Sequence, residues 1–132
     1  EVGTSASDFE FLPYDVNLRR CQRYYYRLTT TADGQMHAMG GISQTTTGRI
    51  VLPFPMNMRA APTSIETTGT ASDYRIQNRN GGDVCTSVPS FVTGHSNHVQ
   101  INMAVAGPLN VGEYCALRAG SADMFIGVPS EL

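Results

Sequence analysis

The segment "HVQINMAVA", residues 98–106, alternates apolar and polar or small side chains along its whole length. Val99, Ile101, Met103 and Val105 occupy every second position. A period of two places these four side chains on one face of a β-strand, whereas a helix would scatter them around its axis. We therefore predict a strand with one buried face, and a fold that supplies a second layer to cover it.

A second alternating segment, "RIVLPFPMNMRA", places its apolar residues at positions 50, 52, 54, 56 and 58. Pro53 and Pro55 occupy the opposite register. Proline has no N–H group to donate to a neighbouring strand. We therefore predict an edge strand or a bent strand here.

Further strands are predicted in short segments separated by residues that favour tight turns. Thr47-Gly48, Asn80-Gly81-Gly82, Gly107-Pro108 and the segment 119–121 are examples of such turns. About seven or eight short strands at nearly regular spacing indicate an all-β protein, an antiparallel jelly-roll-like β-sandwich. The other predicted strands cover residues 35–43, 63–67, 74–78, 84–91, 113–118 and 123–128.

The segment "NLRRCQRYYYRL", residues 17–28, has a different period and predicts one short N-terminal amphipathic helix. Leu18, Cys21, Tyr25 and Leu28 follow helical spacing, which would place them on one buried side. Asp15 or Asn17 is expected to cap the N-terminus of the helix. The run of threonines at 29–31 and the turn residues after it are expected to end the helix.

Four arginines, including Arg19, Arg23 and Arg27, would occupy the opposite side of this helix. Three interpretations remain open: a solvated face, a subunit contact and a site for an anionic ligand. An exposed ion pair contributes only about 0–1 kcal/mol, whereas truncating an arginine buried in an interface is costly. The solvated face is the favoured interpretation; for the second interpretation, the candidate subunit-contact residues are Arg19, Arg23 and Arg27.

The chain has 132 residues, which is the length of one domain, and residues 1–8 are predicted to be a tether from an upstream region. Charged residues make up 15% of the chain and the net charge is −2. This balance argues against a nucleic-acid partner. Because the sequence contains no long apolar run, we expect no membrane insertion.

No local signature of a catalytic site, a nucleotide cofactor or a metal is visible in the sequence, so we expect no catalytic residues and no cofactor. His95 and His98 have HxxH spacing, but no cysteine or carboxylate accompanies them, and a solvated loop is the favoured interpretation. A glycoside hydrolase would need two facing carboxylates. Asp73 and Asp83 suit turns better than that role.

Three cysteines are an odd number without CxxC spacing, which argues against a disulfide framework and a structural zinc site. We expect buried free thiols. A bridge between Cys85 and Cys115 stays open as an alternative.

The segment "DYRIQNRNGGD", residues 73–83, combines an aromatic ring with amides and guanidinium groups. Such a mixture suits sugar hydroxyls or carboxylates, although an ordinary polar hairpin would have the same composition. The candidate ligand-binding residues are Tyr74, Arg75, Asn78, Arg79, Asn80 and His95.

Three separated stretches, "DFEFLPYDVNLRRCQRYYYRL", "VLPFPMNMRAAPTSIE" and "DMFIGVPSEL", together resemble a module at the C-terminal end of tailed-bacteriophage tail fibres and related virion structural proteins. They keep the order of that family across nearly the whole chain. The segment "LPYDVNL" and the residues 128–130 depart from the forms expected there.

This resemblance implies a non-enzymatic domain on the surface of a phage particle, assembled in the host cytoplasm and trimeric. Its partners would be two further copies of itself, other virion proteins and a bacterial surface glycan. One hypothesis is the distal domain of a tail fibre that binds a host receptor. The alternative is a capsid decoration or another structural virion protein that acts only in assembly.

Overall fold

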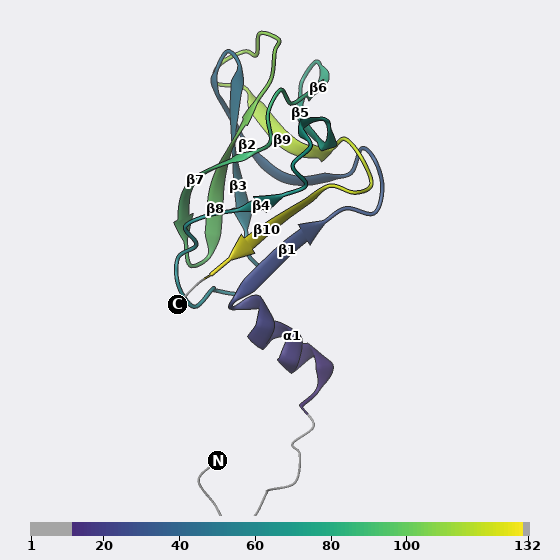
Figure 1. Cartoon of the computed structure of the whole chain (residues 1–132). Coiled ribbons are helices and arrows are strands. Elements are labelled where there is room, and N and C mark those ends of the chain that lie inside the picture. The colour runs from purple at the N-terminus through teal and green to yellow at the C-terminus, as the bar shows by residue number, and fades with distance from the viewer. Residues whose placement is uncertain (1–11, 131–132) are drawn as a thin grey trace, which may run out of the picture.

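The computed structural model of the protein describes residues 12–130, and these form mainly short strands (Figure 1). One α-helix and a 3₁₀ turn, η1 (Ala71–Asp73), accompany ten strands within this range. The elements are α1 (Tyr14–Gln22), β1 (Tyr25–Thr29), β2 (Met36–Gln44), β3 (Thr47–Pro53), β4 (Glu66–Thr67), β5 (Tyr74–Asn78), β6 (Gly81–Val84), β7 (Ser90–His95), β8 (His98–Ala104), β9 (Tyr114–Ala119) and β10 (Phe125–Pro129).

The strands form two antiparallel sheets, which confirms the predicted all-β sandwich. One sheet has seven strands in the order β6-β5-β9-β2-β3-β8-β7, and the other has three in the order β1-β10-β4. The three-stranded sheet lies across one side of the larger sheet (Figure 1). The pairs β1 with β10, β2 with β9 and β3 with β8 are nested, so the chain folds back on itself as in a jelly roll.

The core lies between the sheets and is made by every second residue of the strands. Ile50 faces Ile101 and Leu52 faces Val99 across the β3–β8 pair, and all four side chains are buried. Burying one such side chain contributes roughly 1.5–3 kcal/mol. Partners from other strands and loops include Ile76, Leu117, Met124, Ile126 and Val128.

The predicted helix over residues 17–28 is wrong in its extent and in its buried face. Helix α1 ends at Gln22, and Tyr25 already lies in strand β1. None of the residues of α1 is buried; Leu18 is 41% and Tyr25 39% exposed, and Cys21 is exposed as well. The expected inward packing of Leu18, Cys21 and Tyr25 is therefore wrong.

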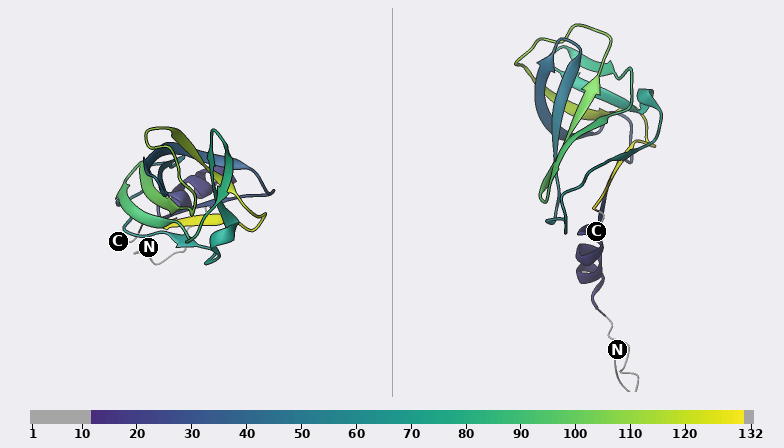
Figure 2. Two further views of the ribbon diagram at one scale, coloured as in Figure 1. Left: turned by 90° about the horizontal axis from the view of Figure 1, so that it is seen from above. Right: turned by 60° about the vertical axis from the view of Figure 1, so that its left-hand side comes forward.

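Local chemistry explains where α1 begins and ends. Pro13 occupies the N-cap position and its carbonyl accepts the N–H groups of Val16 and Asn17, so neither Asp15 nor Asn17 caps the helix as predicted. The consecutive tyrosines at 24–26 favour a strand. Tyr25 and Tyr26 pair with β10. This pairing provides the backbone hydrogen bonds that a longer helix would otherwise have provided. Helix α1 projects away from the sandwich (Figures 1 and 2).

Strand β3 is central, so its predicted place at an edge is wrong. It pairs with β2 on one side and β8 on the other. The pairing with β2 stops at Val51. Pro53, at the end of β3, therefore needs no N–H group to pair with β2. The alternation continues beyond the strand, since Phe54 is half-buried and Met58 is buried.

Two other predicted strands differ from the structure. The segment 84–91 is divided between the end of β6, a crossing loop and the start of β7, because only Cys85 forms an isolated bridge there, with Val105. The segment 63–67 shortens to β4. The remaining predicted strands agree closely with β2, β5, β8, β9 and β10.

The predicted tether, residues 1–8, lies outside the described residues. Within residues 12–130, no helix is long and apolar enough to cross a membrane.

Candidate functional site

The predicted ligand-binding residues do not share one surface. Tyr74 is fully buried, and its hydroxyl bonds to the carbonyl of Phe125. Asn78 is buried too: its amide donates to Asp83 and its oxygen accepts the N–H groups of Asn80 and Gly81. Asn78 holds the hairpin between β5 and β6, whereas Tyr74 links β5 to the smaller sheet, and neither side chain can reach a ligand in this conformation.

The other predicted ligand residues are accessible but separated. Arg79 and Asn80 are exposed at the β5–β6 turn. His95 lies on β7, at the opposite edge of the seven-stranded sheet. It faces His98 across a tight turn, with the two rings stacked at a centroid distance of 4.7 Å. Within residues 12–130, no group of three potential metal ligands occurs.

The three candidate subunit-contact arginines are exposed but do not form one helical stripe. Arg19 lies on α1, Arg23 is the C-cap residue, and Arg27 lies on β1. The guanidinium of Arg27 covers the ring of Phe125 at 4.0 Å from its centroid. Arg23 lines a hollow of about 420 Å³ with residues 54–58, where α1 meets the sandwich.

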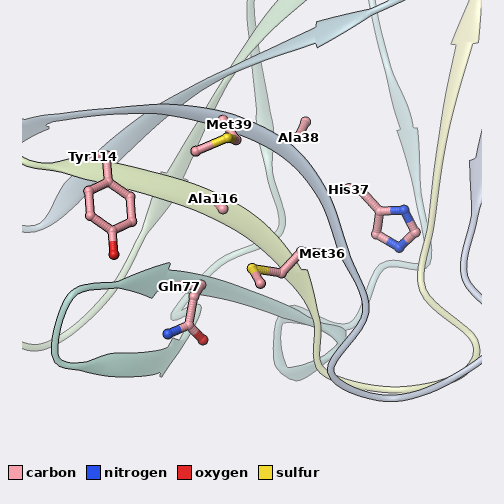
Figure 3. A pocket seen from close by; sticks show the side chains of 7 residues that line it. All are labelled: Met36, His37, Ala38, Met39, Gln77, Tyr114 and Ala116. Carbon is pink, nitrogen blue, oxygen red and sulfur yellow. The ribbon is translucent and has the colours of Figure 1, made fainter.

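A larger hollow, of about 480 Å³, lies on the outer face of the seven-stranded sheet. We use "outer face" for the side that carries the residues alternating with the core residues. Strands β2, β9 and β5 form the hollow, which Figure 3 shows from close by. It is lined by Met36, His37, Ala38, Met39, Gln77, Tyr114 and Ala116.

The register of the strands explains this set. Ala116 of β9 pairs with Met39 on one side and with Gln77 on the other, so the three side chains form a row across the outer face. Tyr114 precedes Ala116 by two positions on the same face. Met36, Met39 and Tyr114 are 64%, 66% and 54% exposed. The outer hollow is therefore apolar and open to solvent.

Polar groups flank the outer hollow on the β5 side. The amide oxygen of Gln77 accepts a 2.9 Å hydrogen bond from Nη1 of Arg118. The amide nitrogen of Gln77 donates to the carbonyl of Asn78. Because an amide has two acceptor positions and two donor hydrogens, Gln77 keeps capacity for a ligand.

His37 is the extra residue of a β-bulge. Met36 pairs with Arg118 and Ala38 with Leu117. Strand β2 therefore has one more residue than β9 between these two pairs. The bulge turns the imidazole away from Met36 and Gln77 (Figure 3). Its Nε2 atom is buried without a hydrogen-bond partner among residues 12–130, and burial lowers the pKa of His37.

All three cysteines are free. Burial raises the pKa of Cys85 to about 12 and that of Cys115 to about 11, so both stay protonated and unreactive near neutrality. Asp73, in η1, accepts a hydrogen bond from the hydroxyl of Ser121, and Asp83, in strand β6 rather than in a turn, accepts one from the amide of Asn78.

Tyr114, Met36, Met39 and Arg118 were missed as site residues from the sequence. The alternation in "EYCALRA" places Tyr114, Ala116 and Arg118 on one face, and that signal was available. The sequence contains no such signal for Met36 and Met39, because the bulge at His37 changes the alternation of β2.

Comparisons with known proteins return no match: no family model, no curated protein and no solved structure is significantly similar to this chain.

Proposed function

We propose that this chain is a non-enzymatic binding module on the particle surface of a tailed bacteriophage, the distal domain of a tail fibre. Its outer hollow binds a glycan of the host surface. The phage assignment rests on the resemblance of the three sequence stretches. The observation that carries the binding role is the open hollow of about 480 Å³ with Tyr114 and Gln77 on its walls.

The chemistry of the outer hollow suits a sugar ring. The exposed ring of Tyr114 and the two methionines offer apolar area to the C–H face of a saccharide. Gln77 offers an amide to its hydroxyl groups. These side chains stand on paired strands rather than on loops, so little ordering accompanies binding.

A homotrimer fits the proposal because, within residues 12–130, no other element buries any residue of α1. Helices of fewer than about 12 residues are marginal alone, and most of their stability comes from packing. None of the nine residues of α1 is buried. Three copies joined through their α1 helices would present three outer hollows, and multivalency raises the strength of weak sites.

A glycan array tests the binding role. The purified chain should bind at least one bacterial surface glycan, and Tyr114→Ala should weaken that binding by about tenfold, the loss expected from removing an aromatic contact of roughly 1–1.5 kcal/mol. Tyr24→Ala is the matched control, because Tyr24 is 48% exposed and lies close to Arg59, outside the hollow. Binding that is insensitive to Tyr114, or absent on the whole array, contradicts the proposal.

The alternative is a structural virion protein, such as a capsid decoration, that acts only in assembly. One observation favours it: the hollow of about 420 Å³ beside Arg23 lies next to α1, none of whose residues is buried, and this hollow is open to a neighbouring chain. This role predicts an oligomer without any glycan binding. Light scattering combined with the array therefore separates the two proposals.

A further inference from the structure

Two arginines lie side by side next to the outer hollow. Arg75 of β5 and Arg118 of β9 are direct cross-strand partners on the outer face. Like charges directly opposite each other in a sheet destabilise it. The nearest acidic residue of the hairpin, Asp83, pairs with Ile76 and therefore lies on the other face, where it bonds to Asn78.

Both guanidinium groups have an unused donor. The Nε atoms of Arg75 and Arg118 are buried and have no hydrogen-bond partner within residues 12–130. Buried polar atoms of proteins are nearly always hydrogen-bonded, so this unpaired pair of donors calls for an acceptor from outside residues 12–130. A carboxylate is the acceptor that matches the planar fork of an arginine.

The position of Arg118 is defined by its surroundings. Nη1 bonds to Gln77, which itself lines the hollow. A Cβ atom on Gly82 would lie 2.9 Å from Nη1, and one on Gly34 would lie 3.2 Å from Nη2. The guanidinium thus occupies space that two glycines leave open, and its bond to Gln77 fixes its orientation beside the wall of the hollow.

We propose that the outer hollow binds a carboxylate-bearing saccharide, with the carboxylate held by Arg75 and Arg118 and the sugar ring packed on Tyr114 and Met36. This inference rests on the proposed glycan-binding function and specifies its ligand class. The volume of about 480 Å³ lies within the usual range of ligand pockets, roughly 300–1,000 Å³. The Arg75–Arg118 pair favours a ligand with an acidic group, and the apolar wall of the hollow favours a ligand with a sugar ring.

Isothermal titration calorimetry on the full chain tests the proposal with three probes. The first set is oligogalacturonate and oligosialate, the second is their carboxyl-reduced forms, and the third is inorganic phosphate. We expect at least one acidic oligosaccharide to bind about tenfold more tightly than its reduced form, because hydrogen bonds to a charged group are stronger than neutral ones. Arg118→Gln should remove this preference.

Arg49→Gln is the matched control. Arg49 lies on β3, bonds to Asn102, is exposed, and is not one of the residues that line the hollow. Its substitution should leave the preference for the acidic probe unchanged. If Arg118→Gln fails to fold, the Nε–H signals of Arg75 and Arg118 in the NMR spectrum of the wild-type chain give the second measurement, and both should shift with the acidic probe.

Each contrary result has a distinct meaning. Equal binding of acidic and reduced saccharides overturns the carboxylate inference while the glycan-binding function stands. Phosphate that binds as tightly as the acidic saccharide and displaces it reduces the site to one for simple anions, and also overturns the inference. If none of these probes binds and no glycan binds on the array, both the inference and the proposed function fail.

Discussion

The phenol hydroxyl of Tyr74 donates a hydrogen bond of 2.6 Å to the carbonyl oxygen of Phe125. Tyr74 belongs to β5 of the larger sheet and Phe125 to β10 of the smaller one, so one side chain links the two layers. The phenol oxygen of Tyr74 in turn accepts the N–H of Thr68 at 3.0 Å, just after β4. A fully buried phenol thus holds the backbone of two strands of the opposite sheet.

Removing the hydroxyl group of Tyr74 should show how much its hydrogen bonds contribute to the free energy of unfolding, apart from the packing of its ring. Tyr74→Phe keeps the ring but leaves the Phe125 carbonyl and the Thr68 N–H without their partner, and should lower the free energy of unfolding by about 1–3 kcal/mol. Urea denaturation measures the difference. Tyr114→Phe, at a 54% exposed position, serves as the control and should match the wild type. A Tyr74→Phe chain as stable as the wild type would show that the hydroxyl contributes little.

Two adjacent glycines of β2 should respond differently to a methyl group. A Cβ on Gly40 would overlap the backbone of Arg49 and Ile50 in the neighbouring strand, whereas one on Gly41 meets only the Glu113 carbonyl at 3.9 Å. Gly40→Ala should therefore destabilise the fold by at least about 1–3 kcal/mol, as overpacking does. Gly41→Ala should stay within about 0.5 kcal/mol of the wild type. Thermal unfolding of both variants decides, and equal melting temperatures would refute the close strand approach at Gly40.

The three thiols should react in two classes. Cys21 is exposed on α1, while Cys85 and Cys115 are buried with pKa values raised to about 12 and about 11. A thiol reagent at pH 8 should modify one group per chain rapidly and the other two only after unfolding. Cys21→Ser should abolish the rapid phase. Rapid modification of two or three groups would contradict the burial of the inner thiols.

Stability should decrease as the pH falls because of His37. Burial lowers the pKa of this imidazole in the folded chain. Below about pH 6.5 the unfolded chain therefore binds a proton more readily than the folded chain does, and the free energy of unfolding decreases. His37→Gln should flatten the loss of unfolding free energy between about pH 7 and 5. His95→Gln, at the exposed hairpin turn, is the control. An unchanged slope in His37→Gln would assign the pH dependence to other groups.

Helix α1 should be needed for assembly and not for the fold of one chain. Because Leu18 is 41% exposed and no residue of α1 is buried, Leu18→Asp should leave the melting temperature of a monomer nearly unchanged. If α1 forms the proposed subunit contact, Leu18→Asp and Arg23→Ala should shift the mass measured by light scattering from trimer towards monomer, with the β-type circular dichroism retained. A wild-type chain that is monomeric at micromolar concentration would end the trimer proposal for this chain.

Much of the fold was predictable from local patterns, and the failures have identifiable causes. The strand at 98–106 was recognised because one face is buried, so Val99 and Ile101 alternate with polar residues. The helix was extended too far because Tyr25 happens to match helical spacing from Leu18. Its strand conformation depends on pairing with Pro129, which is more than a hundred residues away in the chain.

The candidate site was predicted less well, since the residues of one polar segment were assumed to face the same way. Tyr74 and Asn78 share a hairpin with Arg75 and Arg79, yet strand alternation turns the first two into the fold. The aromatic ring that does face the outer hollow, Tyr114, comes from a segment some forty residues further along the chain and was assigned only to a strand.

The sequence by itself determined the class of the fold, because the period of hydrophobic residues is a local property that reports which side of a strand is buried. The tertiary structure alone decided which strands are neighbours, and therefore that Met39, Ala116 and Gln77 form one row and that Arg75 meets Arg118. Strand pairing depends on contacts between distant segments and on bulges such as the one at His37. A one-residue change of register moves every side chain of a strand to the other face, so the composition of a surface site follows only from the assembled sheet.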